Sequence, residues 1–63
     1  MKREEFTNHS TGRTAIVWTS NDGTYEVNFG QTIDGEWVAS ITHPSKVYKS
    51  AAGALRAATR WIA

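Results

Sequence analysis

The chain has 63 residues, a net charge of +1 and no cysteine. A chain of this length holds one domain and buries only about 60% of the surface of its unfolded form, which argues against a deep catalytic cleft. The lack of cysteine excludes a disulfide framework and a thiolate metal site and is typical of a reducing compartment. No apolar run approaches the roughly 20 residues of a membrane helix. We therefore expect no membrane partner and a cytoplasmic protein, in the host cytoplasm if it is viral.

Residues 1–12 are polar and show no hydrophobic period, so we expect a flexible N-terminal arm ahead of a single domain over residues 13–63. Three runs rich in aromatic and β-branched residues follow, and they predict three antiparallel strands at 13–20, 24–30 and 36–43. In the second run, apolar side chains alternate with polar ones and identify the face toward the core as that of Tyr25, Val27 and Phe29.

The strands are separated by two Asp-Gly pairs, at residues 22–23 and 34–35, which are typical of hairpin turns. We predict a three-residue loop that ends in a left-handed glycine at both turns. In the second hairpin this loop sets Val27 opposite Ile41. The three-residue loop therefore places the apolar side chains of both strands on one face of the sheet, namely those of Tyr25, Val27, Phe29, Trp37, Ala39 and Ile41.

The first turn decides where Trp18 lies. A three-residue loop pairs Val17 with Val27 and turns Ile16 and Trp18 to the face opposite the core. A two-residue loop would exchange the two faces and bury both side chains. We favour the three-residue loop because it matches the second turn. An outward Trp18 would then belong to an exposed apolar patch, which usually marks an interaction site.

After the strands, Pro44 interrupts pairing, and residues 46–49 leave two alternatives open, a short fourth strand or a pinned linker. Ser50 is a good N-cap for a helix over 51–63. Trp61 either closes the end of the core or stands at the rim of an interface. The predicted architecture is α+β, a three-stranded antiparallel β-β-β-α meander with one C-terminal helix packed on one face. The helix residues predicted to face the sheet are Ala54, Leu55, Ala58 and Ile62.

The sequence carries no pattern for catalysis or for metal binding. His9 and His43 are the only histidines, and no His, Asp or Glu pair has the spacing of a metal site. No serine lies in a nucleophile elbow, and the glycines form no phosphate-binding loop. We therefore expect neither enzyme activity nor a cofactor, a metal or a small-molecule substrate.

Residues 35–41, 44–46 and 48–58 resemble the strand, turn and helix half of the AP2/integrase-arm DNA-binding domains. In that family a Gly-x-Trp strand is followed by a basic strand and an Ala-rich helix, and the sheet lies in the major groove. The resemblance implies DNA binding. The family's sheet face is dense in arginine, whereas here the strand at 36–43 has none and the strand at 24–30 presents Glu26. The residues in regions where the family places phosphate contacts are Arg13, Lys46 and Lys49.

One hypothesis for function is a small protein-interaction module. It would be an inhibitor or regulator of a larger protein, for example an accessory protein of a phage or other mobile element, or a homodimer. Protein interfaces favour aromatic anchors inside a polar ring, and the exposed sheet face offers both. The predicted interface residues are Ile16, Trp18, Glu26, Asn28, Val38 and Ser40.

The other hypothesis is a nucleic-acid-binding module. Residues 1–42 carry three basic and six acidic side chains, whereas residues 43–63 carry four basic and no acidic ones. This asymmetry favours an anionic partner on the helix side. Trp18 would stack on a base. The phosphate contacts would come from Arg13, Lys46, Lys49, Arg56 and Arg60.

Overall fold

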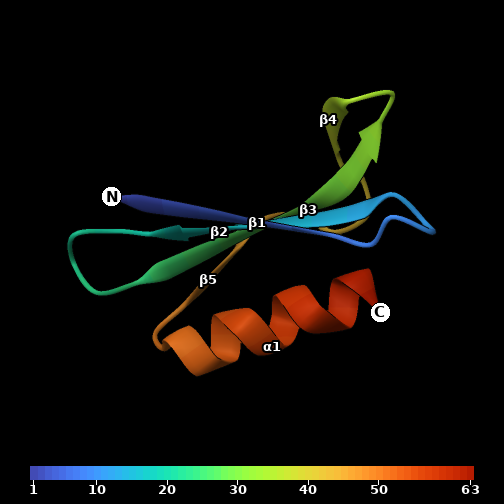
Figure 1. Ribbon diagram of the computed structural model, residues 1–63. Coiled ribbons are helices and arrows are strands. Elements are labelled where there is room, and N and C mark those ends of the chain that lie inside the picture. Colours follow the sequence, from blue (N-terminus) through green and yellow to red (C-terminus); the bar gives the residue numbers. More distant parts are fainter.

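An antiparallel sheet of five strands is covered on one face by a single helix in the computed structural model, which describes residues 1–63 (Figure 1). Strands β1 to β4 lie side by side in chain order, and β5 pairs with β3. The predicted α+β class, with one C-terminal helix on the sheet, is confirmed, and the fourth-strand alternative is realised as β5. The elements are β1 Lys2–Thr7, β2 Arg13–Thr19, β3 Tyr25–Ile33, β4 Glu36–Ala39, β5 Lys46–Tyr48 and α1 Ala51–Ile62.

The expectation of a flexible arm over residues 1–12 is wrong for residues 2–7, which form β1. This strand pairs with β2 from Lys2 opposite Thr19 to Thr7 opposite Thr14. The polar residues after it are its hairpin turn, in which the Asn8 side chain accepts hydrogen bonds from the next backbone amides and Gly12 has a φ of 80°. Sequence periodicity missed β1 because its first four residues are all charged and Phe6 is its only apolar residue, so no apolar alternation marks the strand.

The first hairpin has the predicted register. Val17 lies opposite Val27, and Gly23, with a φ of 85°, ends a three-residue loop in the left-handed conformation. Trp18 therefore points away from the helix, across from Glu26. The alternative of a two-residue loop is not realised.

The predicted register of the second hairpin is wrong. Asp34 and Gly35 both have positive φ, 53° and 82°, so they form a two-residue type I′ turn, and β3 continues to Ile33. Gly30 pairs with Ala39, and Lys46 of β5 takes the place opposite Val27 that was predicted for Ile41. Trp37 and Ala39 therefore leave the face that carries Val27, because a shift of one residue exchanges the two faces of a strand.

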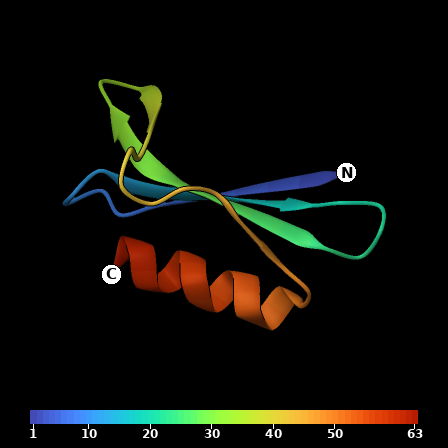
Figure 2. The same ribbon diagram turned by 180° about the vertical axis from the view of Figure 1, so that it is seen from behind.

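Gly30 is required at its position. A Cβ atom there would lie 2.5 Å from the indole ring of Trp37 and would collide with the backbone carbonyl of Val38. The missing side chain lets β4 and its tryptophan approach β3 closely. The β3–β4 hairpin bends away from α1 and projects on the opposite side of the sheet, as both views show (Figures 1 and 2).

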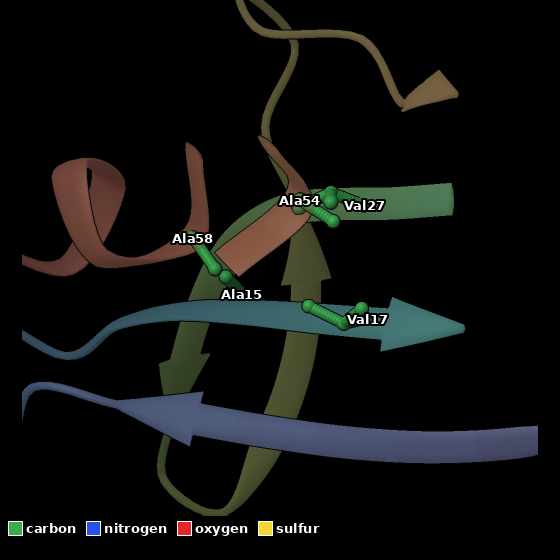
Figure 3. Packing of buried hydrophobic residues seen from close by; sticks show 5 residues of the cluster. All are labelled: Ala15, Val17, Val27, Ala54 and Ala58. Atoms are coloured by element: carbon green, nitrogen blue, oxygen red, sulfur yellow. The ribbon is translucent and has the colours of Figure 1, made fainter. Parts of the chain in front are cut away.

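Small side chains fill the contact between α1 and the sheet. Ser50 caps the helix, and its hydroxyl accepts from the backbone N–H of Gly53 at 3.1 Å. Leu55, which was predicted to face the sheet, is 43% exposed, and Trp61 packs against the core together with Ile62. Ala54, Ala58 and Ile62 face the sheet as predicted, so only one flank of the stripe differs, with Trp61 in contact with the core and Leu55 at the surface. The alanines allow a close approach of the helix to β2 and β3. The buried cluster consists of Ala15, Val17, Val27, Ala54 and Ala58 (Figure 3).

The first turn generates a prediction on pH. The hydroxyl of Ser20, together with the hydroxyl and backbone N–H of Thr24, donates to the Asp22 carboxylate and lowers the pKa of Asp22 from 3.8 to about 2. A lowered native pKa stabilises the fold above the unfolded value and loses that effect as the pH falls through the native value. We expect the free energy of unfolding to drop more between about pH 4 and about pH 2 in the native chain than in Asp22→Asn.

Urea unfolding at a series of pH values measures this difference. Asp34→Asn, in the second turn, is the matched control and should keep the native pH dependence. Equal pH dependence in the native chain and Asp22→Asn would contradict the prediction.

Candidate protein-binding surface

The residues predicted for the protein interface do not form one patch. Ile16 is only 4% exposed. Trp18, Glu26 and Asn28 do lie on the sheet face that α1 leaves uncovered, here called the open face. Val38 and Ser40 instead belong to the side of the projecting hairpin, with Val38 opposite Gln31. The two-residue second turn is the physical reason, since it shifts this strand by one position.

Trp18 is held in place on the open face. Its indole N–H donates to Oδ1 of Asn28 at 2.5 Å, and the Asn28 amide in turn donates to Glu26 and to Ser45 at 3.0 and 2.7 Å. The guanidinium carbon of Arg3 lies 5.6 Å from the centre of the indole ring. The half-buried ring therefore has its polar atom satisfied internally. It borders an open hollow of about 430 Å³ lined by Met1, Trp18, Ser20, Thr24, Glu26, Asn28 and Val47.

The largest apolar exposure lies on and beside the β3–β4 hairpin. Ile41 is fully exposed and Val38 is 48% exposed, while Ile33 and Trp37 also reach the surface. Val38 and Ile41 line one hollow, and exposed apolar side chains that share a surface in this way are typical of an interaction site.

A second hollow, here called the hairpin hollow, lies between this hairpin and the C-terminal end of α1. It has a volume of about 390 Å³ and carries apolar side chains beside a single charged one. The lining residues are Arg13, Gly30, Gln31, Val38, Ala39, Ser40, Ile41 and Trp61.

Trp61 forms the rigid wall of the hairpin hollow. Its indole N–H donates to the backbone carbonyls of Thr14 and Gly30, at 3.1 and 2.9 Å, and its ring meets Phe29 edge to face at 5.7 Å. Arg13 also packs on this ring, with its guanidinium carbon 4.5 Å from the ring centre and Nη1 donating to the Trp61 carbonyl at 3.3 Å. Trp61 thus closes the end of the core and also borders the hollow, so the two alternatives for this residue are both realised.

Of the residues predicted to contact phosphate, two come together. Arg13 and Arg60 line a third hollow of about 360 Å³ beside His43, whose ring lies 4.7 Å from that of Trp61, and no carboxylate lines it. Lys46 lies 5.8 Å from the ring of Tyr48. Lys49 and Arg56 are exposed and line none of the three hollows.

Sequence reasoning missed Ile41 as a surface residue. It was assigned to the core because a three-residue second loop placed it opposite Val27. The only local signal was the Asp34-Gly35 pair, which suits a two-residue type I′ turn equally well.

No protein-family model, curated protein or solved structure was found to match the chain. The resemblance of residues 35–58 to AP2/integrase-arm domains therefore stays a prediction. The one helix, α1, is too short to cross a lipid bilayer.

We predict that Trp61→Phe destabilises the fold by about 1–2 kcal/mol, because phenylalanine keeps a ring in the same place but loses the hydrogen bonds to Thr14 and Gly30. Chemical denaturation followed by circular dichroism measures the change. Trp37→Phe is the matched control, since the Trp37 indole makes no hydrogen bond, and it should change stability less. An equal loss in the two variants would show that the hydrogen bonds of Trp61 contribute little.

Proposed function

We propose that the chain is a small non-enzymatic protein-binding module, a regulator or inhibitor that holds its partner in the hairpin hollow. The observation that carries this proposal is a fully exposed Ile41 and a half-exposed Val38 beside the anchored ring of Trp61. Interfaces concentrate binding energy in such apolar and aromatic groups around a desolvated centre.

The partner's chemistry follows from the lining. Val38, Ala39 and Ile41 favour an aliphatic or aromatic side chain, and the Arg13 guanidinium favours a carboxylate next to it. Asp34 and Glu36, at the tip of the same hairpin, disfavour a polyphosphate on this surface. A segment with an apolar anchor and a single carboxylate beside it is therefore the expected ligand.

The test replaces Ile41 with a photo-crosslinking amino acid in cells that naturally make the chain and identifies the protein that is captured. The partner is then purified and titrated against the native chain and against Ile41→Ser and Val38→Ser. We expect each variant to weaken the affinity by about tenfold or more, because such anchors dominate binding. Because both side chains are already exposed, we expect the circular dichroism spectrum to stay native.

Leu55→Ser is the matched control, since Leu55 is an exposed apolar residue on α1 outside the hairpin hollow. It should leave the affinity unchanged. If Leu55→Ser weakened binding while Ile41→Ser did not, the partner would occupy the helix side and the proposed site would be wrong.

Nucleic-acid binding is a second candidate, favoured by the third hollow. Arg13, Arg60 and His43 surround aromatic rings there with no carboxylate among them, a combination that suits a phosphate beside a stacked base. The AP2/integrase-arm resemblance supports the same candidate. The net charge of +1 limits the affinity, since phosphate neutralisation supplies most of it.

Titration of labelled duplex and single-stranded DNA at increasing salt tests this candidate. We expect affinity to fall steeply with salt, and Arg60→Gln to reduce the salt slope by about one, as for one lost phosphate contact. Arg3→Gln, on the open face, is the matched control and should keep the native slope. Absence of binding at low salt would eliminate the nucleic-acid candidate and leave the protein-binding proposal untouched.

A further inference from the structure

The two Asp-Gly pairs of the chain lie in turns of different length, and this difference bears on a chemical reaction of the backbone. In an Asp-Gly pair the glycine nitrogen can attack the aspartate side chain, because glycine has no Cβ atom to hinder the approach. Asp22 and Gly23 belong to the three-residue turn, and Asp34 and Gly35 form the two-residue turn. All four residues are exposed, and the Cβ positions of both glycines are open. Crowding therefore does not distinguish the two pairs.

The reactive groups of the first pair are both held by hydrogen bonds. The Asp22 carboxylate accepts from the hydroxyl of Ser20, and from the backbone N–H and the hydroxyl of Thr24 at 3.1 and 2.7 Å. The N–H of Gly23 donates to the carbonyl of Ser20 at 3.4 Å. The bonds from Ser20 and Thr24 also lower the pKa of Asp22 to about 2, so that little of the neutral acid, the form that reacts, is present. Attack at Asp22 therefore has to break several hydrogen bonds first.

The reactive groups of the second pair are free. The Asp34 carboxylate is exposed and forms no hydrogen bond or ion pair within the chain, and the N–H of Gly35 has no acceptor. Ring closure requires the peptide group between the two residues to turn over, so that the nitrogen lies beside the side chain. This rotation converts a type I′ turn into a type II′ turn, which has the same positive φ at its first central residue and also suits a two-residue hairpin. The flanking strands can therefore keep their pairing while the reactive geometry forms.

We propose that Asp34 converts spontaneously to isoaspartate in the folded chain, whereas Asp22 is protected. The proposal rests on the hydrogen bonds that hold the first pair and are absent from the second. It is independent of the function proposed for the hairpin hollow.

The conversion proceeds through a cyclic imide. The nitrogen of Gly35 forms a bond to Cγ of Asp34 and closes a five-membered succinimide, and the hydroxyl of the carboxyl group leaves as water with the amide proton. Water then adds to one of the two ring carbonyls and breaks its bond to nitrogen. Cleavage at Cγ regenerates aspartate, whereas cleavage at the backbone carbonyl gives isoaspartate, in which Gly35 is linked through Cγ. No atom is gained or lost overall, and no oxidant or reductant takes part.

Isoaspartate at position 34 alters the turn that aligns β4 with β3. The main chain then passes through the side-chain carbons and is one atom longer between Ile33 and Glu36, which are paired across the turn. Loop length fixes the register of a hairpin, so the longer turn disturbs the pairing of β4. Val38 and Ala39 of this strand line the hairpin hollow. The modification therefore changes the hairpin hollow as well.

Incubation of the folded chain for several weeks at mildly acidic pH and body temperature tests the proposal. A glutamate-specific protease then cuts after Glu26 and Glu36 and separates the two pairs, and electron-transfer fragmentation in a mass spectrometer distinguishes isoaspartate from aspartate. We expect isoaspartate to accumulate at Asp34 about tenfold faster than at Asp22, or more, the factor expected when the protected site must break at least two hydrogen bonds before it reacts. In guanidinium chloride, where neither turn is formed, the two rates should be nearly equal.

Nuclear magnetic resonance on the isomerised chain, purified by ion-exchange chromatography, tests the effect on the hollow. We expect the backbone amide resonances of β4 to shift from their native positions and those of α1 to stay in place. Unchanged β4 resonances would contradict an effect on the hairpin hollow.

Release of Asp22 provides a test by substitution. Ser20→Ala with Thr24→Val removes two hydroxyl donors to its carboxylate and should raise the rate at Asp22 while leaving that of the second pair unchanged. Ser40→Ala with Thr42→Val is the matched control, since these two hydroxyls bond to each other outside both turns, and it should change neither rate. Equal rates at the two pairs of the folded native chain, or a ratio that persists in guanidinium chloride, would overturn the proposal.

Discussion

The attachment of Trp61 to the two central strands is the interaction on which the rest of the structure depends. The helix meets the sheet largely through alanines and valines, which bury little area each, so a single large ring at the end of α1 has unusual weight. Its N–H reaches the carbonyls of Thr14 and Gly30, which are paired across β2 and β3. Helix and sheet are thereby fixed in both position and rotation, and the rotation explains why Leu55 is left at the surface.

The contacts of Trp61 with the sheet also shape the candidate sites. Trp61 and Arg13 line both the hairpin hollow and the adjoining hollow that holds Arg60. Arg13 reaches the ring only because β2 carries it to the helix end, where it also bonds to a terminal carbonyl of α1. Asn8 donates to the neighbouring carbonyl of Ile62 at 2.6 Å, so the turn after β1 supports this corner as well. The candidate surface therefore depends on the contacts made at the C-terminal end of α1. These contacts hold its side chains in place before any ligand binds.

The accuracy of the fold and site predicted from the sequence depended on the lengths of the two hairpin turns. The loop around Asp22 has three residues and the loop around Asp34 has two, although both contain Asp-Gly. One rule applied to both turns placed Trp18 correctly and Ile41 incorrectly. The local sequence does not distinguish the two turns, and the observed second register goes with a distant contact, the packing of Trp37 over Gly30. The helix N-cap at Ser50 could be predicted from the sequence because it is a local interaction. β1 could not be predicted in this way, since its pairing depends on a strand farther along the chain. The hairpin hollow could not be predicted without the correct register of the second hairpin.

The two edges of the sheet differ in a way that bears on association. Beyond β3 the edge is divided between β4 and β5, which have four and three residues and are separated by a segment containing Pro44. Short, interrupted strands are poor templates for a further chain. The β1 edge is longer and unbroken, and four of its six side chains, those of Lys2, Arg3, Glu4 and Glu5, are charged. Charged side chains along an edge strand disfavour pairing with a further chain, so the two edges are protected by different means.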